Sequence, residues 1–262
     1  MALFAVLAII ASVLVQTHGF ILKPRFDSRI VGGEDADIAD YPYQLSFQYY
    51  GAHLCGASLI GNAVALTAAH CTVSYPNNVK IRAGSNFTYT GGELVDVIGI
   101  TQHPKYDIFS IDYDVSVLKL SELVSLGLPV NLQPSGQEIT VGALAVVTGF
   151  GALYEGGASH HQLQKVEVPH IDQSTCNEVF GNGVTNRMTC FGSLEKDFCY
   201  GDNGGPLVYA RNQVGIVSWG YGCARPGYPG VYTKIANSEI NAYIVQKMNE
   251  ENYYCTNKTG TF

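Results

Sequence analysis

Hydrophobic and polar residues alternate over short stretches through most of the chain. In residues 45–49, apolar Leu, Phe and Tyr alternate with polar Ser and Gln, and Gly51 then signals a turn. This period of two is typical of strands with one buried face, and Gly, Pro, Asn and Asp separate many such stretches. The pattern therefore predicts an antiparallel, all-β protein.

The period changes only near the end of the chain. Ile240, Tyr243, Ile244 and Met248 recur at helical spacing, and Ser238 precedes them as a candidate N-cap. We therefore expect one helix, at the C-terminal end.

The first 19 residues have the character of a secretory signal peptide. They contain no charged side chain and include an apolar run from Leu3 to Val15, which is short for a membrane span. The basic start that is usual in signal peptides is missing, so an uncleaved anchor remains the alternative. The segment predicts a secreted, extracellular protein with no membrane attachment once the signal is removed.

Charge narrows the choice of partners. The net charge is −7, and the part from residue 30 onward carries about −9, because it lacks Lys23, Arg25, Asp27 and Arg29. An acidic surface without a Lys/Arg run disfavours nucleic acid and anionic lipid. A charged partner is expected to be basic.

Cysteine and glycosylation patterns agree with export. The seven cysteines are too far apart for zinc motifs of the CxxC type, so disulfides are the expected state. Seven is an odd number, and Cys255 in the polar tail is the candidate for a free thiol or an intermolecular disulfide. Asn86 and Asn257 begin sequons and are candidate glycan acceptors.

Four segments carry candidate chemistry in a specific order. They are Arg29–Gly33, Leu66–Cys71, Asp114–Leu118 and Gly201–Leu207. In this order they resemble the chymotrypsin/trypsin family of serine proteases, and the resemblance extends from Ile30 to the terminal helix. It implies two six-stranded antiparallel β-barrels, near residues 30–128 and 129–262, with the C-terminal helix in the second part. The chain crosses between them near residues 127–129.

The resemblance assigns catalytic roles to three positions. His70 would accept the proton of the nucleophile, Asp114 would fix the tautomer of the imidazole, and position 203 would attack the carbonyl. Position 203 is Asn203, whose amide nitrogen has its lone pair delocalised into the carbonyl and is no comparable nucleophile. The backbone N–H groups of Gly201 and Asn203 would still form an oxyanion hole, unless the loop has drifted from its ancestral shape.

An activation site also resembles that of the family. Cleavage after Arg29 would free the amino group of Ile30, which in active relatives pairs with the carboxylate before the nucleophile, here Asp202. Residues 1–19 would then be the signal peptide and residues 20–29 a propeptide. The alternative is a site that was inherited but is not used.

Residues at the positions of the specificity pocket give opposing indications about ligand binding. Asp197 matches the carboxylate that gives trypsins their Arg/Lys preference, and Gly220 and Gly230 match two small walls. Phe198 replaces a small pocket-lining residue, so its ring is expected to obstruct the pocket. The alternative is that the ring turns into the core. The segment Ser218-Trp219-Gly220, which would pair with a substrate strand, is unchanged.

Disulfides and metal sites follow from the same resemblance. It implies three pairs, Cys55 with Cys71, Cys176 with Cys190, and Cys199 with Cys223. The calcium loop of trypsins is not recognisable after Arg82, and His160-His161 is more readily explained as a solvated pair than as metal ligands. We expect no metal and no cofactor.

A more specific resemblance concerns residues 103–114. The segments His103–Asp107 and Ile111–Asp114 look like those of the mite trypsins known as group 3 allergens, and together with Asn203 they resemble the inactivated serine protease paralogues of the scabies mite. That resemblance implies a secreted gut protein that binds host proteins, notably complement components. The alternatives are a decoy that holds substrates or inhibitors in the cleft, and a weakly active trypsin-like endopeptidase.

Overall fold

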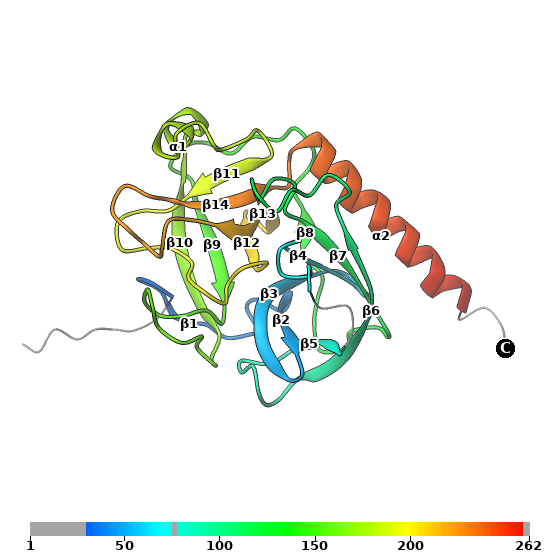
Figure 1. Ribbon diagram of the computed structural model, residues 1–262. Coiled ribbons are helices and arrows are strands. Elements are labelled where there is room, and N and C mark those ends of the chain that lie inside the picture. The colour runs from blue at the N-terminus through cyan, green and yellow to red at the C-terminus, as the bar shows by residue number, and fades with distance from the viewer. Residues whose placement is uncertain (1–29, 75–77, 259–262) are drawn as a thin grey trace, which may run out of the picture.

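The computed structural model describes residues 30–74 and 78–258, with side chains described as far as residue 250. The predicted signal peptide, the propeptide and Arg29 therefore lie outside the described residues, as do the side chains of Cys255 and Asn257. Two closed β-barrels lie side by side, each with six strands, as the family resemblance implied (Figure 1). None of the helices in the described ranges is long and apolar enough to span a bilayer.

The first barrel closes in the order β2-β3-β4-β7-β6-β5, and all its strand pairs are antiparallel. Its strands are β2 (Gln44–Tyr49), β3 (Ala52–Gly61), β4 (Val64–Thr67), β5 (Val79–Ala83), β6 (Glu93–Gln102) and β7 (Ser116–Leu120). The alternation at residues 45–49 does form a strand, and Tyr50 and Gly51 turn into β3 with positive φ angles of 48° and 81°. Both faces of β2 are buried. On its polar face, Gln44 accepts a hydrogen bond from Thr148 of the second barrel at 2.6 Å, and Gln48 donates to the carbonyl of Thr88 at 2.5 Å.

The second barrel closes in the order β9-β10-β11-β14-β13-β12. Its strands are β9 (Leu144–Gly149), β10 (Gln164–Ile171), β11 (Met188–Phe191), β12 (Pro206–Tyr209), β13 (Asn212–Trp219) and β14 (Gly230–Lys234). Two short strands extend this sheet: β1 (Glu34–Asp35) pairs with β10, and β8 (Asn131–Leu132) runs parallel to β13. The sequence pattern indicated neither of these short strands.

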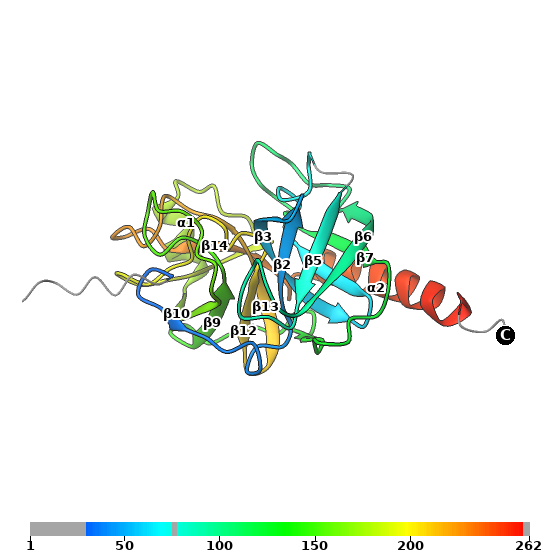
Figure 2. The same ribbon diagram turned by 90° about the horizontal axis from the view of Figure 1, so that it is seen from below.

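Each end of the described chain packs against the barrel that is more distant from it in sequence. Ile30 is fully buried in the core of the second barrel, beside Val217 and Tyr232, although it precedes the first barrel in sequence. The C-terminal helix α2 (Ser238–Lys258) packs instead against β3, β4 and β7 of the first barrel (Figure 2). The predicted boundary between residues 128 and 129 therefore separates the strands of the two barrels. It does not assign the two ends to the barrels that they pack against, because each end carries apolar side chains that cover the other barrel's core.

The helices differ from the sequence prediction in two details. Asn237, and not Ser238, caps α2, since its Oδ1 accepts the backbone N–H of Glu239 at 3.1 Å and of Ile240 at 3.3 Å. A second helix, α1 (Gln173–Val179), was not predicted. Asp172 caps it by accepting two backbone N–H groups, and Asp172 was the sequence signal that could have indicated this helix.

Three disulfides confirm the pairs that the resemblance implied. They join Cys55 to Cys71, Cys176 to Cys190, and Cys199 to Cys223. Each closes a loop of 14 to 24 residues in sequence separation. Such loops contribute about 3 kcal/mol each when loop-closure entropy dominates.

An ion pair ties the two barrels together. Arg187, beside β11, donates from Nε to both oxygens of Asp112, at 2.9 and 3.0 Å, in the loop before β7. The Asp112 side chain is 12% exposed. Burial raises its pKa, but hydrogen bonds from Arg187, Tyr113 N–H and Thr185 lower it by more, so the pKa lies below its ordinary value.

Replacing Arg187 should weaken this link. Arg187→Met leaves a largely buried carboxylate without its main partner and is expected to lower the free energy of unfolding by about 1–3 kcal/mol at pH 7. The depressed pKa of Asp112 stabilises the folded state above about pH 4, so the loss should shrink as pH falls below that value. Urea denaturation at several pH values measures both effects.

Lys80→Met is the matched control. It breaks the Lys80–Asp96 pair, whose side chains are 43% and 58% exposed, and should change stability by less than about 0.5 kcal/mol. Equal losses in the two variants would show that the Arg187–Asp112 pair has no special role.

Candidate functional site

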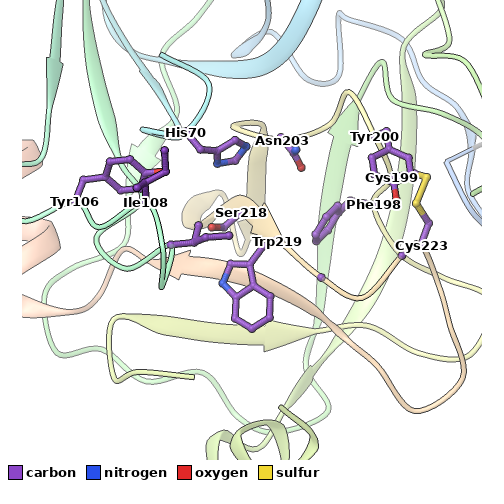
Figure 3. A pocket seen from close by; sticks show the side chains of 13 residues that line it. His70, Tyr106, Ile108, Phe198, Cys199, Tyr200, Asn203, Ser218, Trp219 and Cys223 are labelled. Carbon is purple, nitrogen blue, oxygen red and sulfur yellow. A yellow bond between two sulfur atoms is a disulfide. The ribbon is translucent and has the colours of Figure 1, made fainter. Parts of the chain in front are cut away.

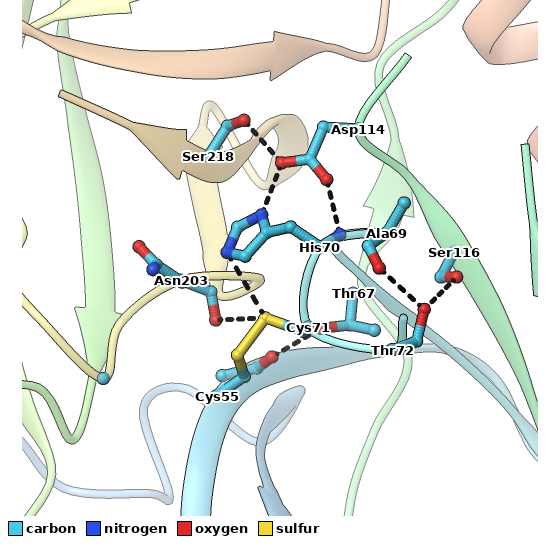
Figure 4. Close-up of a disulfide and its surroundings, with 12 residues drawn as sticks. Cys55, Thr67, Ala69, His70, Cys71, Thr72, Asp114, Ser116, Asn203 and Ser218 are labelled. Atoms are coloured by element: carbon cyan, nitrogen blue, oxygen red, sulfur yellow. Dashed lines mark hydrogen bonds and ion pairs between the residues drawn. A yellow bond between two sulfur atoms is a disulfide. The ribbon is translucent and has the colours of Figure 1, made fainter. Parts of the chain in front are cut away.

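The loops at the ends of β4 and β7 bring His70 and Asp114 together. Thr67 of β4 pairs with Ser116 of β7, so the residues just beyond these strand ends are neighbours. His70 Nδ1 lies 2.8 Å from Asp114 Oδ2, and the backbone N–H of His70 donates to Asp114 Oδ1 at 2.9 Å (Figure 4). With Nδ1 held by the carboxylate, Nε2 points away from Asp114 and lies 3.7 Å from Cys71 Sγ (Figure 4).

Asp114 has a third partner from the other barrel. Ser218 Oγ, on β13, donates to Asp114 Oδ2 at 2.5 Å, and the Asp114 side chain is only 1% exposed. A buried carboxylate with three donors is held in one orientation. The geometry therefore fixes the imidazole in a base-competent tautomer.

Asn203 stands next to His70 on the wall of a cleft of about 360 Å³ (Figure 3). Its backbone is tightly held, because its carbonyl accepts the N–H of Gly56 at 2.7 Å and the next N–H, of Gly204, donates to Val217 at 2.8 Å. Within the described ranges its side-chain amide has no hydrogen-bond partner. Position 203 thus faces the base with a carboxamide.

The loop of Gly201 to Asn203 carries two backbone N–H groups without an acceptor among the described residues. The N–H groups of Gly201 and Asn203 donate to no acceptor among the described residues, and Gly201 adopts a φ of 100° that favours glycine. These free donors are consistent with the predicted oxyanion hole, which stays a prediction.

A buried histidine that sequence analysis did not single out supports this loop. His53 Nε2 lies 2.9 Å from the carbonyl oxygen of Gly201, and its Nδ1 lies 2.8 Å from Ser46 Oγ. Burial lowers the pKa of His53 to about 4, so the ring is neutral near pH 7. It can then donate from Nε2 to Gly201 and accept the Ser46 hydroxyl proton.

Asp202 is buried beneath the same loop. Its oxygens accept the N–H groups of Gly151 at 2.7 Å and of Cys199 at 2.9 Å. A Cβ at Gly149 or Gly151 would lie within 2.3 Å of this carboxylate, so both positions need glycine. Burial raises the pKa of Asp202 to about 7, although the two backbone donors act in the opposite direction.

Asp197 is sealed beneath the cleft. It is 3% exposed, and its carboxylate accepts the N–H groups of Phe198 at 2.9 Å and of Ala224 at 3.1 Å. Burial raises the pKa of Asp197 to about 7. It is not among the residues that line the cleft, whereas Phe198 is.

The ring of Phe198 fills the space between the two predicted glycine walls. A Cβ at Gly230 would lie 2.5 Å from Phe198 Cε1, and one at Gly220 would lie 3.8 Å from Phe198 Cζ. The ring also packs edge-on against Tyr232, with centroids 5.3 Å apart. The sequence left two alternatives for the ring, obstruction of the pocket or a turn into the core. The ring does both, because it belongs to the core and also forms the floor of the cleft.

Several cleft residues were not predicted. Tyr106, Ile108, Ile111 and Tyr200 all line it. Figure 3 shows Tyr106 and Ile108 on the far side of His70 from Phe198, and Tyr200 beside the Cys199–Cys223 disulfide. Their closeness in sequence to Asp114 and Asn203 was the available signal, but only the folded loops show which side chains face inward.

Metal ligands and glycan acceptors are limited in the described part of the chain. One cluster there has ligand atoms within 4.8 Å of one another, namely Cys55, His70 and Cys71, but both sulfurs belong to a disulfide and are not thiolates. The rings of His160 and His161 have separate partners, Gln162 and Thr88. Asn86 Oδ1 accepts the N–H of Ile38 at 2.6 Å, and glycosylation at Asn86 remains a prediction.

Comparison with known proteins identifies the family. Residues 30–242 match the family model described as Trypsin. The chain is 45% identical over 222 residues to the vitellin-degrading protease of Bombyx mori, covering 82% of this chain and 84% of that protein. It is 43% identical to a trypsin of Phaedon cochleariae, covering 79% and 84% of the two chains, and 40% identical to trypsin 5G1 of Aedes aegypti, covering 81% and 83%.

These relatives are named as proteases, and the residues that match the family model include both barrels, the three disulfides and the cleft. The chain therefore belongs to the trypsin family of serine proteases.

Proposed function

We propose that this chain is a proteolytically inactive member of the trypsin family that is secreted and acts by binding other proteins. The observation that carries the proposal is Asn203, which stands beside the His70 base where the resemblance puts the attacking serine. A carboxamide offers no lone pair comparable to that of an alkoxide formed from serine. The base then has no nucleophile to activate.

The size of this effect decides between a slow enzyme and an inactive one. In subtilisin, loss of the serine lowers turnover by about 10⁶-fold, and the remaining catalysis comes from binding and the oxyanion hole. A residual rate of that size supports no digestive role. Weak endopeptidase activity is therefore the less favoured alternative.

Phe198 acts as a second obstacle that is independent of Asn203. Its ring lies between Gly220 and Gly230 and separates Asp197 from the cleft. An Arg or Lys side chain would have to displace this ring to reach the carboxylate, and that would disrupt packing against Tyr232. Both trypsin chemistry and trypsin specificity are lost on this proposal.

A second candidate function is a decoy that holds protein segments in the cleft. The open cleft of about 360 Å³ and the intact His70–Asp114 pair favour it, because a collapsed cleft would leave only outer surfaces. The partners we propose are extracellular proteins, including host complement components, as the mite resemblance implies. Cys255 would permit an intermolecular disulfide, and the gut lumen would be the site of action.

Restoring the two altered side chains should restore activity. With Ile30 freed by cleavage after Arg29, wild type and Asn203→Ser are expected to leave an Arg p-nitroanilide substrate intact, whereas Asn203→Ser with Phe198→Ser cleaves it. The reason is that both the nucleophile and the pocket are then present. Release of nitroaniline measures the rate.

The control for that assay adds His70→Ala to the double variant, which should return the rate to background. Hydrolysis by wild type above the rate of its own His70→Ala variant would refute the proposed inactivity.

Binding of benzamidine tests the pocket separately. Wild type should show no binding at concentrations that saturate Phe198→Ser, because the amidinium reaches Asp197 only when the ring is absent. Isothermal titration calorimetry measures the affinity. Equal affinity in the two proteins would mean that Phe198 does not close the pocket.

The buried carboxyl of Asp197 predicts a pH dependence. Because its pKa is raised from 3.8 to about 7, the folded state binds more protons than the unfolded chain between these values, and stability falls as pH rises through this window. Phe198→Ser admits water and should make the slope shallower, while Asp202 contributes equally in both proteins. Free energies of unfolding from pH 4 to 8 test this, and equal slopes would contradict it.

A further inference from the structure

The cleft beside Asn203 has walls without charge. Apart from His70, its lining contains no basic or acidic side chain, since Asp197 lies behind the ring of Phe198. Aromatic and aliphatic groups dominate instead, among them Tyr106, Ile108, Ile111 and Trp219. Tyr106 and Ile108 lie on the far side of His70 from Phe198 (Figure 3). A basic side chain entering this space would lose its hydration and find no carboxylate to replace it.

The apolar surface continues beyond the cleft on both sides. Ile108 is 56% exposed and its neighbour Phe109 is 94% exposed, on a loop that Asp107 braces by accepting the N–H of Phe109 at 2.9 Å. On the other side, Phe180 packs against Trp219 and Tyr221, with ring centroids 4.9 and 5.7 Å apart. Exposed apolar groups that flank an uncharged cleft are typical of a binding surface.

A strand edge between these walls is open to a ligand backbone. β13 pairs with β14 as far as Trp219, opposite Val231, but its pairing with β12 ends at Ile216. The loop before β12 adds two bonds at Val217, whose N–H donates to Gly205 and whose carbonyl accepts the N–H of Gly204. In the described part of the chain, no strand pairs with the second edge at Ser218–Gly220. An extended segment can add there by backbone hydrogen bonds.

We infer that the cleft binds an extended, uncharged protein segment that places a compact apolar side chain, such as Leu, against Phe198. The segment pairs with Ser218–Gly220, and its neighbouring apolar side chains contact Ile108 and Trp219. This inference rests on the proposed function, because a bound segment is retained only when Asn203 leaves it uncut. It differs from the Arg/Lys preference of trypsins, since the ring of Phe198 forms the floor.

The chain offers an internal probe for this binding. Trp219 is its single tryptophan and lies in the cleft wall, so its fluorescence reports occupancy. Two acetylated, amidated hexapeptides that differ only in one residue, Leu or Arg, with Ala and Val elsewhere, are titrated into the protein with Ile30 freed. Calorimetry on the same solutions detects binding that leaves the fluorescence unchanged.

The Leu peptide should bind wild type at least about tenfold more tightly than the Arg peptide, a difference of about 1.4 kcal/mol, and Phe198→Ser should reverse this order by exposing Asp197. Ile108→Ala should weaken the Leu peptide by about fivefold through lost apolar contact. Leu194→Ala removes an aliphatic side chain that is 65% exposed and does not line the cleft, so it should leave the affinity unchanged.

The outcomes separate this inference from the proposed function. Absence of Leu-peptide binding, or equal binding of the Arg peptide by wild type, overturns the inference and leaves inactivity standing. Cleavage of either peptide, detected by mass spectrometry and abolished by His70→Ala, overturns the proposed inactivity, while a tenfold preference for Leu would still support the described specificity.

Discussion

The carboxylate of Asp114 is the point on which both barrels and the cleft depend. It accepts the ring N–H and the backbone N–H of His70 from the first barrel, and the hydroxyl of Ser218 from the second. The backbone carbonyl of Asp114 accepts the hydroxyl of Thr233, on β14, at 2.7 Å. Because a buried carboxylate requires such donors, this group links the two barrels at the cleft and orients the imidazole of His70.

The loop around Asn203 is held by contacts that do not involve the Asn203 side chain. Asp202 has its two backbone donors, Gly149 and Gly151 leave room for it, and His53 supports the carbonyl of Gly201. None of these contacts involves the side chain of residue 203. On the proposed function, this loop, inherited from proteases, maintains the shape of a binding cleft.

Phe198 shows how one side chain can change the character of a site without disturbing the fold. Its ring packs on Tyr232 as a core residue would, and it separates a carboxylate from the cleft by the same packing. Burial disfavours the ionised form of Asp197 and raises its pKa to about 7. The cleft therefore has an apolar floor at the place where the resemblance predicts an accessible carboxylate.

Local sequence by itself predicted an all-β chain, the strand at residues 45–49 and the C-terminal helix, because side-chain period is a property of neighbouring residues. The two barrels and the roles predicted for His70, Asp114 and position 203 came from motifs that resemble those of a family. Tertiary structure alone decided that Ile30 lies in the second barrel, that α2 covers the first, and that Phe198 is at once core and floor. It also selected Tyr106, Ile108 and Tyr200 as cleft walls. These features depend on contacts between segments far apart in the chain, and no local pattern encodes which loop will face which.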